Sequence, residues 1–212
     1  MKHFKNITTL IFDFGGVLIN LDKNLCIQNF KQLGVQNLEK VLNNYAQSGF
    51  FEQLERGKIN AETFRDEIRK MTPDTLTDSQ IDFAWCSFLQ DIPTEKLDLL
   101  IELRKKYRIL LLSNTNSIHI QYSLARFNYK DRSLCDYFDK CYLSYEMGMA
   151  KPDAMIFETL LTDACLQAEE CLLLDDGAKN IEQAHKLGIQ TYLVKEKEDL
   201  SFLLNAETFI VD

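Results

Sequence analysis

The sequence predicts an α/β fold: a doubly wound parallel-sheet (Rossmann-like) core with an inserted α-helical cap domain. Three observations predict it. Short apolar runs are continuous rather than alternating, as expected for strands that are covered on both faces of a parallel sheet. Helical patterns alternate with these runs over the second half of the chain. A purely helical stretch follows the first run and interrupts the alternation.

The apolar runs with the length of buried strands are residues 9–12, 109–112, 141–143, 172–174 and 191–194. Apolar residues at helical spacing predict helices over 94–107, 152–166 and 178–187, and Gly188 is a natural stop for the last of them. Because strands that alternate with helices form right-handed crossovers, this order predicts one parallel sheet with helices on both faces.

The interval between the first and second strands does not alternate. It predicts helices over residues 25–33, 38–47, 61–71 and 78–89, with breaks at Gly34, Gly49, Gly57 and Pro73. We therefore expect a core domain made of residues 1–22 and 91–212, and a helical cap made of residues 23–90.

Composition limits the classes of partner. The 212 residues include 24 Lys and Arg against 32 Asp and Glu, a net charge of −8 that repels nucleic acid. A local cluster of cations can still bind a small anion. The N-terminus lacks a signal-peptide pattern, and no run approaches the roughly 20 apolar residues that span a bilayer. Six cysteines without a C-x-x-C pair are expected as reduced thiols. We expect a cytoplasmic protein with no membrane or nucleic-acid partner; the oligomeric state is left open.

Chemically active side chains follow each of the first four predicted strands. In chain order they are Asp13, Ser113 with Asn114, Lys151, and Asp175 with Asp176. Taken singly, each has an ordinary interpretation as a helix cap, a turn residue or a solvated charge. Ligands of open parallel sheets, however, bind at the carboxyl ends of the strands. The joint occurrence at four strand ends therefore favours a single site.

The three carboxylates of this set indicate a metal ion. Asp13, Asp175 and Asp176 repel one another, so they require a cation if they lie together. Oxygen ligands without His or Cys select a hard ion, and Mg²⁺ is the one that suits phosphate chemistry. With the metal bound, one oxygen of an ionised Asp13 can attack phosphorus.

The remaining groups suit a phosphate. Ser113, Lys151 and the backbone N–H groups around Phe14 and Gly15 can hold the phosphoryl oxygens, whose charge must be stabilised during transfer. The glycine pair that begins at Gly15 permits a tight turn and close approach of the backbone. The partner that we predict is a small phosphorylated molecule.

These residues resemble a known family. The order Asp13-x-Gly-Gly-Val, Ser113-Asn114, Lys151-Pro152 and Asp175-Asp176 is similar to that of the haloacid dehalogenase-like hydrolase superfamily. The likeness covers essentially the whole chain. The subgroup that looks most similar holds the bacterial alpha-glucose-1-phosphate phosphatase and the phosphatase half of epoxide hydrolase. Segments 12–18, 55–59, 112–116 and 148–152 carry that closer likeness.

The resemblance implies roles for the metal site. Asp13 would be the nucleophile, forming an aspartyl phosphate, and also a metal ligand. Gly15 would offer its backbone carbonyl to Mg²⁺, and Asp176 would be a direct ligand. Asp175 would act through water or orient Lys151.

The resemblance also implies how the substrate is held. Ser113 and Lys151 would bind the phosphate, with Asn114 beside them, and a sugar phosphate is the expected substrate.

Substrate choice is expected from the cap, since the core contacts only the phosphate. Glu55, Arg56 and Lys58 could contact sugar hydroxyls or phosphate. Equally, this segment could be a helix C-terminus capped by Gly57, with its cations complementing the helix dipole.

One position departs from the family pattern. Phosphatases of this family usually have a second Asp two residues after the nucleophile, which serves as acid and base, and here Gly15 occupies that position. Either the leaving group needs little protonation, or another carboxylate (Asp22, Glu52 or Glu55) substitutes for it. A third interpretation is a catalytically weak module that binds phosphate or metal. A metal-independent haloacid dehalogenase is a further alternative, but it gives no reason for the paired aspartates.

Overall fold

A five-stranded parallel sheet with the strand order β4-β3-β2-β5-β6 forms the centre of the protein. The strands are β2 (Thr9–Phe12), β3 (Arg108–Ser113), β4 (Lys140–Leu143), β5 (Cys171–Asp175) and β6 (Gln190–Leu193). The structure is a computed structural model that describes residues 3–36, 38, 42, 49–205 and 208–210. Strand β2 pairs with β3 on one side and with β5 on the other, so the chain extends the sheet first in one direction and then in the other. This arrangement confirms the predicted doubly wound α/β fold.

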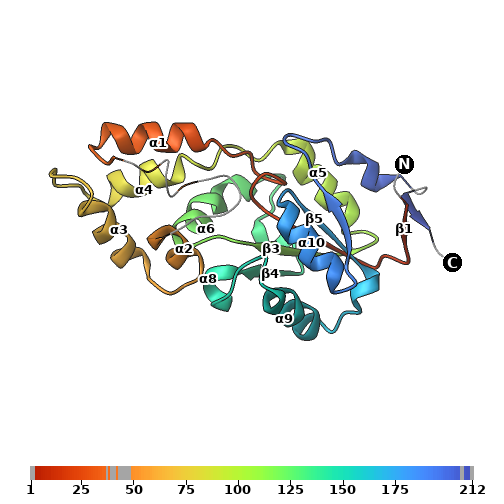
Figure 1. Ribbon diagram of the computed structural model, residues 1–212. Coiled ribbons are helices and arrows are strands. Elements are labelled where there is room, and N and C mark those ends of the chain that lie inside the picture. The colour runs from red at the N-terminus through yellow and green to blue at the C-terminus, as the bar shows by residue number, and fades with distance from the viewer. Residues whose placement is uncertain (1–2, 37, 39–41, 43–48, 206–207, 211–212) are drawn as a thin grey trace.

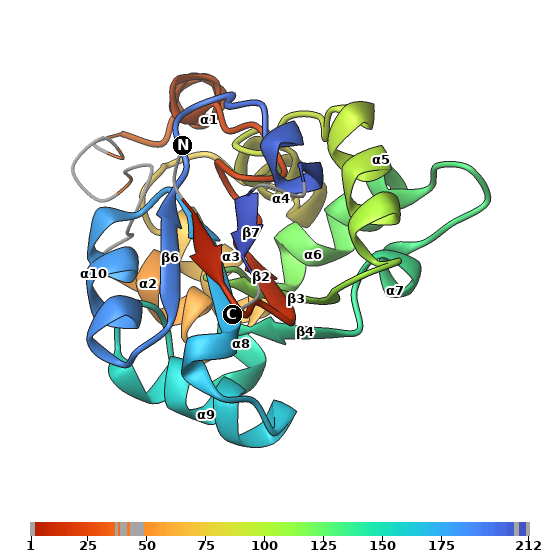
Figure 2. The ribbon, with the colours of Figure 1, turned by 90° about the vertical axis from the view of Figure 1, so that its right-hand side faces the viewer.

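Alternate residues of the central strands pack on opposite faces of the sheet. Ile11 of β2 and Leu173 of β5 belong to one buried cluster, together with side chains of α9 (Ala154–Ala164) and α10 (Ala178–Lys186). Leu10 of β2 belongs to the larger cluster, which includes side chains of α5 (Thr94–Leu103). Figure 2 shows α9 and α10 on one side of the sheet and helices α5 (Thr94–Leu103), α6 (Ser117–Ser123) and α7 (Leu134–Tyr137) on the other. Coverage on both faces explains why the strand sequences are apolar throughout.

Several short elements have no counterpart in the sequence prediction. Strand β1 (Phe4–Lys5) pairs with β7 (Phe209–Ile210) as a separate parallel ribbon. Helix α8 (Ser144–Met147) follows β4, and the remaining turns are η2 (Leu124–Phe127), η3 (Ala168–Glu170) and η4 (Ser201–Leu204). Elements of two to four residues show too little periodicity to be recognised in a sequence.

The segment between β2 and α5 contains helices, as predicted. They are α1 (Lys23–Gln32), α2 (Phe50–Glu55), α3 (Ala61–Arg69) and α4 (Asp78–Cys86). Three of them match predicted helices with shifted ends. The predicted helix 38–47 lies outside the described residues, apart from Leu38 and Leu42. Helix α2 was not predicted, and it begins directly after Gly49, which the prediction treated only as a break.

These helices gather at the end of the molecule opposite the two termini (Figure 1). Trp85 of α4 is fully buried there, and its ring centroid lies 5.0 Å from that of Phe51 and 5.8 Å from that of Phe64. An aromatic cluster of this kind gives the helices a core of their own. The division into a core of 1–22 and 91–212 and a cap of 23–90 stays a prediction.

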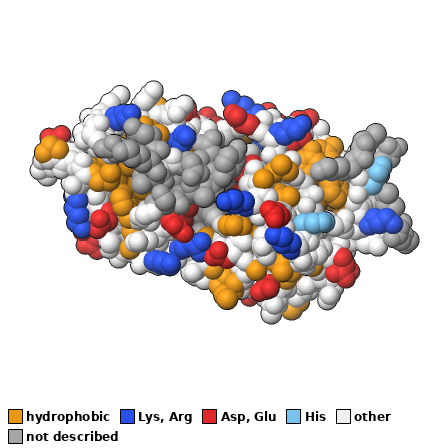
Figure 3. All heavy atoms as spheres, in the orientation of Figure 1, with side chains coloured by type: hydrophobic (Ala, Val, Ile, Leu, Met, Phe, Trp, Pro, Cys, Tyr) orange, Lys and Arg blue, Asp and Glu red, His pale blue; other side chains and the backbone are white. Residues whose placement is uncertain are grey.

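The surface carries both signs of charge. On the face shown in Figure 3, Lys and Arg side chains are interspersed with Asp and Glu, as is usual for a globular domain. Among the helices of the described residues, none combines the length and the apolar character that crossing a bilayer requires.

Candidate active site

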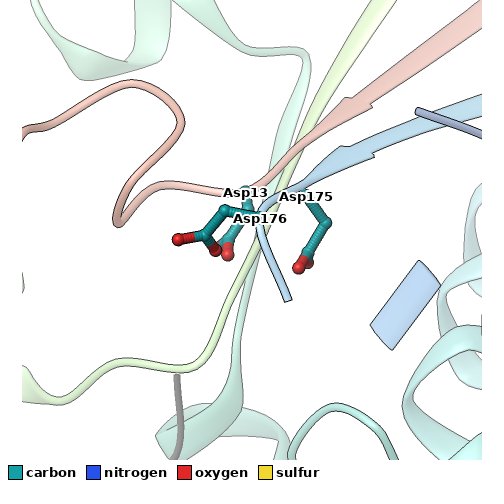
Figure 4. A group of neighbouring side chains, drawn as sticks. All are labelled: Asp13, Asp175 and Asp176. Atoms are coloured by element: carbon teal, nitrogen blue, oxygen red, sulfur yellow. The ribbon is translucent and has the colours of Figure 1, made fainter. Parts of the chain in front are cut away.

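Three carboxylates converge where β2 and β5 end. Asp13 directly follows β2, Asp175 is the last residue of β5, and Asp176 comes next. One carboxylate oxygen of each lies within 4.8 Å of the others. In Figure 4 the carboxylates of Asp13 and Asp176 lie next to each other, and that of Asp175 lies to one side. The parallel pairing of β2 with β5 brings the two strand ends together, as the sequence predicts.

Lys151 joins two of these carboxylates. Its Nζ lies 2.9 Å from Asp13 Oδ1 and donates to Asp175 Oδ2 at 2.6 Å and to the carbonyl oxygen of Leu112 at 2.9 Å. The ammonium group is buried, and these three contacts satisfy all three of its donors inside the protein. Burial alone would lower the pKa of Lys151, but the negative charges of Asp13 and Asp175 hold it above the ordinary value. Lys151 is therefore a fixed positive charge beside Asp13.

Asp175 has a supporting position. Its side chain is fully buried, and its Oδ1 accepts hydrogen bonds from the backbone N–H of Gly177 and from Asn180 Nδ2, both at 2.8 Å. Its Oδ2 accepts from Lys151. With both oxygens occupied by donors of the protein, Asp175 holds Lys151 in place, which is one of the two roles that the resemblance implied.

Asp13 and Asp176 both face the pocket at the strand ends. Burial, then the charges of Asp175 and Asp176, raise the pKa of Asp13 to about 7 against the opposing effect of Lys151. Burial and the charge of Asp175 raise the pKa of Asp176 to about 6. Crowded carboxylates with raised pKa values are the electrostatic situation that a bound cation relieves.

The donor set fits Mg²⁺. Asp13 and Asp176 offer hard oxygen ligands, and the glycine pair brings backbone close to them. Gly16 has a φ of +73°, and a Cβ atom at this position would lie 2.1 Å from Asp176 Oδ2. Only glycine fits there, because a methyl group would displace the carboxylate.

The loop after Asp13 is held from two sides. The backbone N–H of Phe14 donates to Asp13 Oδ1 at 2.6 Å, which orients the carboxylate. On the far side, the buried Lys96 of α5 donates its ammonium to the carbonyl oxygen of Val17. Phe14 and Gly15 line the pocket, and their contact with phosphate stays a prediction.

The end of β3 supplies two predicted residues. Ser113 is buried and lines the pocket. Asn114 lines it too, but its amide is engaged with the Lys151 backbone: Nδ2 donates to the carbonyl oxygen, and Oδ1 accepts from the N–H, both at 2.8 Å. Asn114 therefore fixes the position of Lys151 in this structure.

The three candidate specificity residues differ in whether they line the pocket. Glu55, the last residue of α2, lines the pocket. Arg56 instead pairs with Glu52 at 2.8 Å and with Asp153 at 2.5 Å, and neither Arg56 nor the exposed Lys58 lines the pocket. Burial is the largest cause that raises the pKa of Glu55 to about 8, followed by the charges of Glu52 and Asp13.

Further residues line the pocket besides the predicted site residues. They are Leu21, Phe88, Leu89, Thr115, His119 and Asn180. His119 is buried against Trp85, with ring centroids 4.2 Å apart, and burial lowers its pKa to about 4. A neutral imidazole stacked on an aromatic ring forms a wall of the pocket. Apolar lining residues carry no local signal in a sequence, because they look like any other core residue.

The geometry can be compared with known proteins. A family model described as haloacid dehalogenase-like hydrolase matches residues 7–188. The chain belongs to this family. A D-ribitol-5-phosphate phosphatase from Bacteroides thetaiotaomicron is 35% identical over 205 residues, which cover 94% of this chain and 100% of that protein.

Solved structures of the family agree closely with this fold. A haloacid dehalogenase family enzyme from Bacteroides thetaiotaomicron, solved as the wild-type protein with magnesium and inorganic phosphate, is 48% identical. Its TM-score is 0.89, and the match covers 94% of this chain and 100% of that chain. A family hydrolase from Porphyromonas gingivalis is 37% identical with a TM-score of 0.87, covering 94% and 98% of the two chains.

These comparisons confirm three expectations drawn from the sequence. The chain is a haloacid dehalogenase-like hydrolase with a Rossmann-like core. Its enzyme class is that of the phosphoric monoester hydrolases. Magnesium, the expected cofactor, is present in the complex of the 48% identical relative.

Proposed function

We propose that this protein is a magnesium-dependent phosphatase that hydrolyses a small phosphorylated sugar or sugar alcohol through an aspartyl phosphate on Asp13. The observation that carries the proposal is the placement of Asp13, which lies beside a buried ammonium group and within reach of a second carboxylate, Asp176, in one pocket. This is the arrangement that in-line phosphoryl transfer to a carboxylate requires.

In this proposal each residue of the site has its own role. Asp13 Oδ1 is held by the Phe14 N–H and by Lys151, which leaves Oδ2 as the attacking atom. Lys151, through its positive charge, and Ser113, through its hydroxyl, would stabilise charge on the phosphoryl oxygens. Asp13 and Asp176, with the carbonyl oxygen of Gly15, would hold Mg²⁺, which when bound neutralises phosphate charge and keeps Asp13 ionised.

The substrate class rests on the relatives and on the pocket. The 35% identical protein is a D-ribitol-5-phosphate phosphatase. Besides Asp13 and Asp176, the pocket has the apolar side chains Leu21, Phe88 and Leu89 and one further carboxyl group, Glu55. A carboxyl group in such a place can bind hydroxyl groups of a polyol, while the apolar wall sets the length that fits.

The test is phosphate release across a panel of sugar phosphates and polyol phosphates, D-ribitol 5-phosphate included, with and without Mg²⁺. The expected result is release with Mg²⁺ and none with EDTA or in the Asp13→Asn variant. Equal release by wild type and the variant would exclude the mechanism. Chloride release from 2-chloropropionate would instead indicate a dehalogenase. If neither phosphate nor chloride is released in any assay, the protein is a binding module.

A further inference from the structure

The residue that follows the nucleophile by two positions provides no proton. Gly15 has no side chain, and a Cβ atom built on it would lie 3.3 Å from Cδ1 of Leu21. An apolar side chain thus borders the space beside this position. Hydrolysis of an alkyl phosphate nevertheless needs a proton on the departing alkoxide, and this help is worth about 10²–10⁴-fold. The proton must come from elsewhere in the pocket.

Three carboxylates were candidates for supplying this proton: Asp22, Glu52 and Glu55. The first two have other partners. Asp22 caps α1, its Oδ1 accepting from the N–H of Leu25 at 2.9 Å. Glu52 pairs with Arg56 at 2.8 Å, and its side chain is 46% exposed. Neither lines the pocket that contains Asp13, whereas Glu55 does.

The end of α2 is fixed to the core so that Glu55 is held in place. Ser144 Oγ donates to the backbone carbonyl oxygen of Glu55 at 2.5 Å, and the same hydroxyl accepts from the N–H of Thr115, another pocket residue. Gly57 approaches the carbonyl oxygen of Tyr145 so closely that a Cβ atom would lie 2.1 Å from it. These contacts join the helix directly to the chain that follows β3 and β4.

We propose that Glu55 is the general acid and base of the phosphatase, in the place of the aspartate that Gly15 replaces. The proposal rests on the function proposed above. In the first step Asp13 Oδ2 bonds to phosphorus, the ester P–O bond breaks, and the Glu55 carboxyl gives its proton to the departing oxygen. In the second step Glu55 takes a proton from water, the water oxygen bonds to phosphorus, and the bond from phosphorus to Asp13 breaks.

The electrostatics around Glu55 agree with this cycle. The negative groups that face it are Glu52 and Asp13, and the positive groups are Arg56 and Lys151. Burial and the two negative charges outweigh the two positive ones, so the pKa of Glu55 is raised to about 8. A carboxyl group with this pKa carries its proton at neutral pH, as a general acid must.

The experiment compares Glu55→Gln with Glu62→Gln on two substrates. The first is D-ribitol 5-phosphate, whose alkoxide needs a proton, and the second is 4-nitrophenyl phosphate, whose leaving group needs none. Glu62 is an exposed residue of α3 that neither lines the pocket nor belongs to the charges that face Glu55, so its variant is the control. Unfolding temperature and Mg²⁺ binding are measured for each variant.

Glu55→Gln is expected to lose about 10²–10⁴-fold in kcat with the alkyl phosphate. With the aryl phosphate, Glu55→Gln should still release one equivalent of nitrophenolate in a fast burst. Turnover should then be slow, because the variant lacks the base that activates water to hydrolyse the aspartyl phosphate. Glu62→Gln should match the wild type on both substrates.

Two results would overturn the role of Glu55. One is wild-type turnover of the alkyl phosphate by Glu55→Gln. The other is an equal loss on both substrates without a burst, which would mean that Glu55 only positions or supports the site. A wild-type protein that releases no phosphate from either substrate would instead contradict the phosphatase function itself.

Discussion

Lys151 Nζ lies 2.6 Å from Asp175 Oδ2 in the interior of the protein, where the side chains of both residues are 1% exposed or less. Replacing Lys151 by Met would leave two buried carboxylates without their cation. We expect phosphatase activity to be lost and the free energy of unfolding in Mg²⁺-free buffer to fall by about 3–5 kcal/mol. Urea unfolding and phosphate release measure the two effects.

The matched control for this prediction is Lys105→Met. Lys105 pairs with Glu102 at 2.6 Å, but both side chains are at least half exposed. A surface pair of this kind contributes about 0–1 kcal/mol. Equal unfolding free energies for the two variants would contradict the assigned role of Lys151.

Gly16→Ala should weaken Mg²⁺ binding. The new methyl carbon would lie 2.1 Å from Asp176 Oδ2, so the carboxylate has to move. We expect a higher dissociation constant for Mg²⁺ in isothermal titration calorimetry. Gly148→Ala is the control, because Gly148 has a φ of +70° similar to the +73° of Gly16 but no atom within 4 Å of the added carbon. Identical Mg²⁺ affinities in both variants would mean that Asp176 is no ligand.

Gly57→Ala should reduce turnover more than Mg²⁺ binding. The methyl group would lie 2.1 Å from the backbone oxygen of Tyr145 and would push the end of α2, with Glu55, off the core. Gly49→Ala, at the start of the same helix, has a φ of +62° and open space around the added carbon, so it should cost only the backbone strain of about 1–3 kcal/mol. Steady-state kinetics and urea unfolding together separate the two variants, and similar kcat values would argue against a docked α2.

Mg²⁺ should stabilise the protein through Asp176. Binding to the folded state alone raises the free energy of unfolding by about 2.7 kcal/mol at 100 times the dissociation constant. We expect the melting temperature to rise with Mg²⁺ in the wild type and to change little in Asp176→Asn. Calorimetric melting with a Mg²⁺ series tests this, and a full Mg²⁺ response in the variant would refute it.

The pH dependence of stability should report on Glu55. Its pKa is about 8 in the folded protein against an ordinary value of 4.5, so the folded state binds this proton more tightly. The stability that this proton contributes is complete below about pH 4.5 and is lost as the pH rises through about 8. In Mg²⁺-free buffer, wild type should therefore lose stability relative to Glu55→Gln over that interval. A constant difference in urea unfolding between pH 5 and pH 9 would contradict the raised pKa.

The sheet and the core of the site could be predicted from the sequence for a local reason. Residues 9–12 are apolar throughout because β2 is covered on both faces, and the same holds for β5. Once the strands are known to be parallel, Asp13 and Asp176 must meet at their carboxyl ends. Run length and residue type, both properties of short segments, thus sufficed to predict that these two carboxylates share one site.

The tertiary structure decided what the sequence left open. Glu55, Arg56 and Lys58 are neighbours in the sequence with the same prediction, yet only Glu55 lines the pocket, because Arg56 turns to Asp153, 97 positions away. Asn114 likewise hydrogen-bonds to the backbone of Lys151, 37 positions away, a contact that its neighbours in the sequence do not predict. Such choices follow from how α2 docks on the core and from long-range hydrogen bonds, which no local pattern of apolar and polar residues encodes.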